Sequence, residues 1–125
     1  MIEEFIKQIM GYLNKIDALY SKAYYEEVAK DATFPYVVVP TITFSTLSAG
    51  DLILFDIEIY NNEISDIRIE SIIDKLRAKL NDYVFNNDKI AFHVGFENGN
   101  IVKIQEQDLM GRRISFSARV FEKGE

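Results

Sequence analysis

The chain has 125 residues and a formal net charge of −6 at pH 7, from fourteen basic and twenty acidic residues. This length is that of one domain with its own core, so residues 1–125 are predicted to form a single domain. The acidic balance argues against nucleic acid or an anionic membrane surface as the main partner and favours proteins. Because the chain has no cysteine, disulfides, a thiolate nucleophile and a cysteine zinc site are excluded.

The first predicted element is an amphipathic helix over about residues 2–20. Polar residues separate apolar ones that recur every three or four positions. The segment lacks the basic start and the uninterrupted apolar core of a signal peptide, and no run approaches the roughly twenty apolar residues of a membrane span. We therefore expect a soluble protein made in the cytoplasm. The apolar positions are Ile2, Phe5, Ile6, Ile9, Leu13, Ile16 and Tyr20.

A weak polar strand or extended segment is predicted over residues 22–31, followed by an apolar strand over about 36–44. The only two prolines of the chain, Pro35 and Pro40, bracket the valine run of the second strand. Since proline lacks the N–H of a ladder, pairing is expected through Tyr36–Val39 and is interrupted at Pro40. This pattern suits an edge strand, or a strand whose outer part pairs only when another subunit arrives.

Residues 48–51 predict a turn, and residues 52–60 form the clearest strand pattern of the chain, with strict alternation. One face holds Ile53, Phe55, Ile57 and Ile59, and the other holds Leu52, Leu54, Asp56, Glu58 and Tyr60. The second face is apolar apart from its two carboxylates. We therefore expect either a helix or a partner to cover it.

A second helix is predicted from a cap at Ser65, with Asp66 near its positive end, to about residue 84. Its buried face is expected to contain Ile69, Ile72, Ile73, Leu76, Leu80 and Tyr83.

The last third predicts strands over about 90–96, 100–107 and 112–121. Asn98 and Gly99 predict a two-residue hairpin between the first two, and residues 108–111 predict a turn before the third. The expected fold is α+β, an antiparallel β-sheet with two amphipathic helices packed on it, in the order α-β-β-β-α-β-β-β.

Few side chains predict chemistry. His93 is the only histidine and lies on a strand, where a half-exposed position without a catalytic role is the common case. Asp56 and Glu58 lie two apart on one strand, about 7 Å from each other, a separation that acid/base catalysis could use. We favour a solvated or interface-facing strand surface for them. Neither a P-loop nor a dinucleotide fingerprint is present, so we expect no enzyme, no cofactor and no metal.

Protein contact is the more strongly indicated role. Arg113 and Arg119 share an outward face with Ser115 and Ser117, and with Arg112 they suggest a small basic patch or gatekeeper charges on an edge strand. A loop over residues 45–51 and the Asn98–Gly99 tip are candidate segments that reorder on docking. The candidate contact residues are Ser45, Thr46, Leu47, Ser48, Asp51, Asp56, Glu58, Asn98, Gly99, Arg112, Arg113 and Arg119.

Over about residues 20–121 the chain resembles the tail completion, or tail terminator, proteins of long-tailed bacteriophages and prophages. The order and spacing of the elements carry the resemblance: "AYYEEVAKDATF" leads into Pro35-Tyr36-Val37-Val38, then into a hairpin and an alternating strand. A helix "IESIIDKLRAKL" follows, and then a final strand with Asp108 and Arg112-Arg113-Ile114-Ser115-Phe116.

The resemblance implies an α+β subunit that assembles into a ring, typically hexameric, at the head-proximal end of the tail tube. Such a ring ends tube polymerisation and presents the surface that joins the head. Its partners would be other copies of the chain, the major tail tube protein and the head–tail connector protein, with no main role in contacting nucleic acid or membrane. The protein would occur in the host bacterial cytoplasm during assembly and in the virion tail.

Two alternatives stay open. One is an acidic binding or immunity-type module that inhibits a basic protein partner, with a strongly salt-dependent affinity. The other, which we favour least, is a small enzyme that uses Asp56, Glu58 or His93 and would need a cleft around them.

Overall fold

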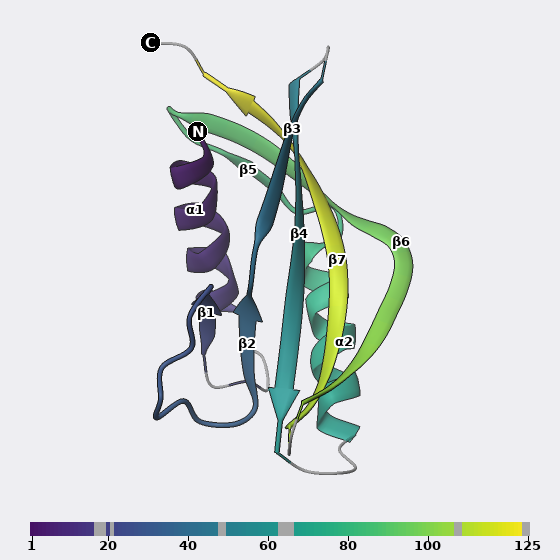
Figure 1. The fold of residues 1–125 in the computed structure, drawn as a ribbon. Helices are drawn as coiled ribbons and strands as arrows, with labels where there is room; N and C mark the ends of the chain where they lie inside the picture. The colour runs from purple at the N-terminus through teal and green to yellow at the C-terminus, as the bar shows by residue number, and fades with distance from the viewer. Residues whose placement is uncertain (17–19, 21, 48–49, 63–66, 107–108, 124–125) are drawn as a thin grey trace.

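The computed structural model describes residues 1–16, 20, 22–47, 50–62, 67–106 and 109–123. In these ranges the chain forms two helices, α1 (Ile2–Lys15) and α2 (Ile67–Leu80), and one sheet (Figure 1). The strands of the sheet are β1 (Ala23–Tyr25), β2 (Tyr36–Val39), β3 (Ile42–Leu47), β4 (Gly50–Asn61), β5 (Val84–Asn86), β6 (Ile90–Glu106) and β7 (Leu109–Glu122). The predicted α+β class is confirmed.

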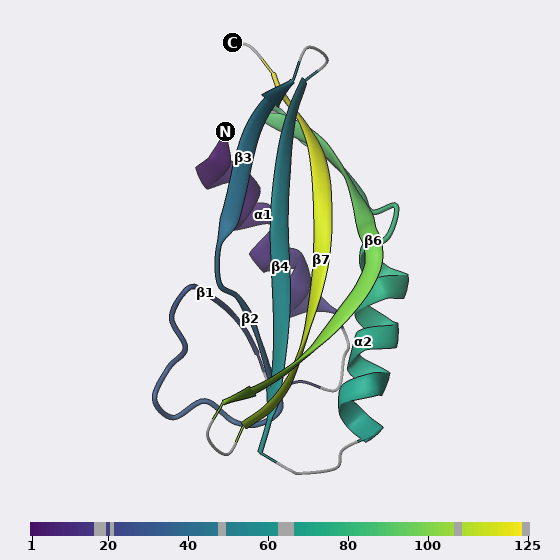
Figure 2. The ribbon, with the colours of Figure 1, turned by 45° about the vertical axis from the view of Figure 1, so that its right-hand side comes forward.

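The sheet has the order β1-β2-β4-β7-β6-β5, and β3 also pairs with β4 (Figure 2). Neighbouring strands are antiparallel except β1 and β2, which are parallel, so the sheet is mixed. β2 and β3 lie on the same side of β4, where β2 pairs with residues 58–60 and β3 with residues 50–55. The predicted strand over 36–44 is therefore two strands, because Pro40 ends the first as its missing N–H requires.

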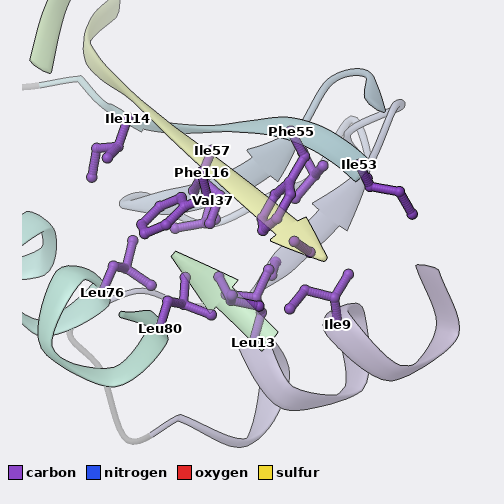
Figure 3. Packing of buried hydrophobic residues seen from close by; sticks show 14 of the residues in the cluster. Ile9, Leu13, Val37, Ile53, Phe55, Ile57, Leu76, Leu80, Ile114 and Phe116 are labelled. Atoms are coloured by element: carbon purple, nitrogen blue, oxygen red, sulfur yellow. The ribbon is translucent and has the colours of Figure 1, made fainter. Parts of the chain in front are cut away.

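Both helices cover one face of the sheet, here called the helix face. Phe5 of α1 packs edge-on against Phe55 of β4 and Phe92 of β6, with ring centroids 5.7 and 4.9 Å apart. Figure 3 shows Leu76 and Leu80 of α2 pointing into the same core, next to Leu13 of α1. One continuous apolar core thus lies between the helices and the sheet.

The predicted alternation of β4 is confirmed, since Ile53, Phe55, Ile57 and Ile59 are all buried on the helix face. On α2 the five predicted aliphatic positions are buried, and Tyr83 packs against them. On α1, Phe5, Ile9 and Leu13 form the buried stripe, whereas Ile2 is exposed.

Both helices are shorter than predicted. Ile16 is extended, with φ −64° and ψ 128°, so the pattern that continues to Tyr20 does not continue the helix. Asp82 adopts a left-handed φ of 65° after α2, a conformation that a short polar residue tolerates and that stops a helix. The chain then forms β5, which periodicity alone had placed partly in the helix. Ser65 and Asp66 lie outside the described residues.

The predicted Asn98–Gly99 hairpin is wrong. β6 runs through this segment as one strand beside β7, and its register shifts between Phe96 and Ile101. Phe96 pairs with Phe116 and Ile101 with Ile114, so β6 uses more residues than β7 over this stretch, as in a β-bulge. Pairing with β7 on both sides of the segment therefore overrides the local turn signal.

The real connection between β6 and β7 lies at residues 107–108, outside the described residues. Because Glu106 pairs with Leu109, residues 109–111 of the predicted turn belong to β7. Likewise Gly50 and Asp51 of the predicted 48–51 turn belong to β4.

Candidate protein-contact surface

One end of the helix-free face is closed by the chain itself. Tyr36 and Val38 of β2 and Tyr60 of β4 are buried there. The segment that follows β1 packs over them with Val28, Ala32 and Phe34. The sequence pattern predicted that a helix or a partner covers the face that holds Tyr60. This apolar cluster shows that the segment after β1 buries Tyr60 instead.

The two carboxylates of β4 are engaged with β7. Ser115 Oγ donates to Asp56 Oδ1 at 2.7 Å, and Arg113 Nε donates to Glu58 Oε2 at 3.0 Å. Tyr60 also donates its hydroxyl to Glu58 Oε1 at 2.9 Å. Asp56 and Glu58 therefore bind different partners across the strand pair, an arrangement typical of a strand surface.

The predicted group of three arginines is divided between the two faces. Arg112 lies on the helix face, where Nη2 and Nε contact Glu70 Oε1 of α2 at 2.8 and 3.0 Å. Arg113 lies on the helix-free face and is paired with Glu58. Arg119 is exposed on that face, opposite Leu52 and His93. Arg112 thus fixes α2 to β7 and takes no part in a surface patch.

His93 contacts a single carboxylate, with its Nε2 3.0 Å from Asp82 Oδ1, and both side chains are exposed. Within the described ranges no three His, Asp or Glu side chains are grouped so that they could hold a metal ion. Both side chains are thus open to solvent, whereas the enzyme hypothesis requires a cleft that encloses them.

A shallow hollow of about 280 Å³ lies on the helix-free face beside β3. Its polar lining comes from Thr41, Thr43, Asp56 and Ser115, and Leu54 adds an apolar side chain. The hollow therefore extends from β3 across β4 to β7 on this face.

The outer edge of β1 is closed by a side chain. The Asn14 amide donates to the Ala23 carbonyl at 3.2 Å and accepts from the Ala23 N–H at 3.0 Å. The next outward carbonyl, that of Tyr25, accepts from the Glu27 N–H at 2.7 Å. The amide of Asn14 thus takes the place of a neighbouring strand.

The outer edge of β3 has no such closure in the described part of the chain. β3 pairs with β4 through one edge, and no described strand pairs with the other. Its sequence, ITFSTL, has neither charge nor proline, the features that usually protect an edge. Phe44 on this strand remains 39% exposed.

A second open edge lies across the sheet on β6. β5 pairs only with residues 91–93 of β6, and the backbone of Val94 bonds to Asp82 and Tyr83. From Gly95 to Glu106 no strand of the described chain pairs with the outer edge. Ile101 and Val102 are 37% and 46% exposed there. Below, "open edges" means Ile42–Leu47 and residues 95–106.

The structure therefore moves the candidate contact residues from loops to strand edges. Ser45 is exposed on β3, and Thr46 and Leu47 also belong to β3, opposite Asp51 and Gly50. The expected 45–51 docking loop is thus wrong, and Ser48 lies outside the described residues. Asn98 and Gly99 belong to the backbone of β6. Sequence reasoning missed the open edge of β6, because the Asn-Gly signal suggested a turn.

The sequence matches no protein-family model, and no curated protein resembles it significantly. Neither described helix is long and apolar enough to cross a membrane.

Proposed function

We propose that this chain is a structural protein of a phage or prophage, which caps the head-proximal end of the tail tube as an oligomeric ring. The ring would end tail polymerisation and provide the surface that joins the head. Its partners would be other copies of the chain, the major tail tube protein and the head–tail connector protein. It would act in the host bacterial cytoplasm during assembly and remain in the virion tail.

The observation that carries this proposal is the pair of open edges on opposite sides of one sheet. A contact between two different surfaces gives each copy two neighbours. It forms a ring when the rotation between copies closes. A subunit with one open edge would instead stop at a pair.

The surface chemistry supports a role in stoichiometric assembly. Asp56, Glu58 and His93, which a catalytic role would use, lie on an open strand surface with partners of their own. The edges themselves combine unpaired backbone with exposed apolar side chains, which is the chemistry of strand addition between proteins.

Electron microscopy after deletion of this gene from the phage or prophage genome that encodes it tests the proposal. We expect full heads together with unattached tails of uneven or abnormal length. Normal virions in the deletion strain would contradict the proposal and favour the acidic inhibitor alternative.

A further inference from the structure

We propose that β3 of one copy pairs antiparallel with residues 98–103 of β6 in the next copy, so that the sheet continues through the ring. The inference rests on the ring of the proposed function and names the contact that builds it.

Strand direction favours this pairing. β3 is antiparallel to β4, β4 to β7 and β7 to β6, so β3 and β6 run in opposite directions within one copy. Copies set side by side in the same orientation then present β3 and β6 as an antiparallel pair, the more stable arrangement per residue.

The exposed apolar side chains fit one register of this pair. Phe44 lies opposite Ile53 and Ile101 opposite Ile114, so both belong to the helix face. With Phe44 beside Ile101, the residues Thr43 and Val102 become neighbours on the helix-free face. Since side chains of paired residues must share a face, this register places the exposed Phe44 beside the exposed Ile101 and continues both faces. β3 has no charge, so Lys103 meets no like charge on it.

The register also sets a stagger between copies. Phe44 pairs with Ile53 of β4, which in turn pairs with Ala118 of β7. Ile101 pairs with Ile114, which lies four residues from Ala118 along β7. Four residues correspond to about 13 Å, and each copy advances the sheet by four strand spacings, roughly 19 Å, when the spacing to the next copy is included. The ratio tilts the strands by about 35° from the ring axis, which is the tilt that closed barrels require.

Competing edge contacts satisfy fewer groups. Pairing β3 with β3 of a second copy forms a two-fold dimer and leaves the β6 edge open in both copies. The edge of β1 is occupied by Asn14. The β3–β6 contact is the one that uses both open edges at once.

Disulfide trapping tests the contact, and the natural lack of cysteine leaves only engineered thiols to react. The double variant Thr43→Cys/Val102→Cys is expressed from the genome that encodes the chain, and the lysate is oxidised and separated on a denaturing gel. Three strand spacings, about 14 Å, separate the two positions within one copy, so an internal disulfide is excluded. We expect a ladder of multimers that ends at the copy number of the ring.

Two controls fix the interpretation. Thr43→Cys alone gives no ladder, and neither does Thr43→Cys/Ser71→Cys, since Ser71 is exposed on α2, away from both edges. Dimers of the Thr43→Cys single variant would instead support two-fold pairing and overturn the inference.

Absence of the ladder from the double variant would also overturn it. The gene deletion distinguishes this failure from failure of the proposed function. A tail phenotype without a ladder removes only the β3–β6 contact, whereas a ladder with normal virions in the deletion strain removes the tail role.

Discussion

Two strand edges on the same side of this sheet differ in whether their outward backbone groups are hydrogen-bonded within the described chain. The edge of β1 is three residues long, and the Asn14 amide satisfies both backbone groups of Ala23. The edge of β3 is six residues long, uncharged and unpaired in the described chain. A single copy thus closes one edge with its own side chain and leaves open the longer edge, the more attractive template for another strand.

The largest expected effect is a loss of stability when the core of a single copy is cut back opposite β3. Phe55 is buried opposite Ile42 of β3 and contacts Phe5 and Phe116. Phe55→Ala should lower the free energy of unfolding by about 3–5 kcal/mol, measured by denaturant unfolding of the unassembled protein. Leu54→Ala, on the opposite face and 37% exposed, should lower it by less than about 1 kcal/mol. Equal losses would contradict the assignment of faces.

The closed end of the helix-free face depends on a glycine. A Cβ at Gly111 would lie 2.9 Å from the Ile59 carbonyl oxygen and 2.9 Å from the Tyr60 ring. Because both neighbours are packed, Gly111→Ala should cost about 1–3 kcal/mol of stability. At Gly95 the nearest atom to an added Cβ is 3.8 Å away, so Gly95→Ala should be tolerated. A thermal shift of the same size in both variants would contradict this packing.

Removing the Asn14 side chain should make the outer edge of β1 available for pairing with another chain. Asn14→Ala removes two hydrogen bonds from Ala23, each contributing about 0.5–1.5 kcal/mol, and exposes the edge of β1. We expect a loss of stability and an increase in concentration-dependent association, measured by light scattering. The neighbouring exposed Lys15→Ala should change neither, and unchanged association of Asn14→Ala would mean that the amide does not protect the edge.

The smallest expected effect concerns the loss of stability at low pH that the Glu4 carboxyl group causes. Gln8 and then Asn87 donate hydrogen bonds to Glu4 at 2.7 and 3.1 Å, and they lower its pKa below the ordinary 4.5. The stabilisation this gives is present above pH 4.5 and is lost as the pH falls through the lower pKa of the folded state. Glu4→Gln should therefore flatten the fall of the melting temperature in acid relative to the natural chain and to Glu3→Gln. Identical pH profiles would contradict the linkage.

The fold class and the buried faces could be predicted because periodicity reports burial directly. The alternation of β4 and the stripe of α2 placed Ile57 and Leu76 correctly. Local signals were wrong where long-range pairing decides the backbone. Asn98–Gly99 would turn in isolation, but β6 pairs with β7 on both sides of this segment, up to Phe96 and again from Ile101.

The candidate site was predicted only in part for the same reason. The prolines correctly predicted that pairing ends after Val39. The edge of β2, however, is paired with β1, and the open edge belongs to β3. The order of strands in the sheet determines which strand lies at an edge, and the pattern of one strand does not contain that order.

Complementation of the gene deletion tests most directly whether the open edges build a tail-terminating ring. The variant Thr43→Lys/Ser45→Lys places two charges on the exposed edge strand, and Ser71→Lys/Ala78→Lys makes the same charge change on exposed positions of α2. Each surface change should leave stability within about 0.5 kcal/mol. We predict that the natural chain and the α2 variant restore uniform tails joined to heads, and that the β3 variant leaves unattached tails of uneven length. Normal particles from the β3 variant would contradict the account.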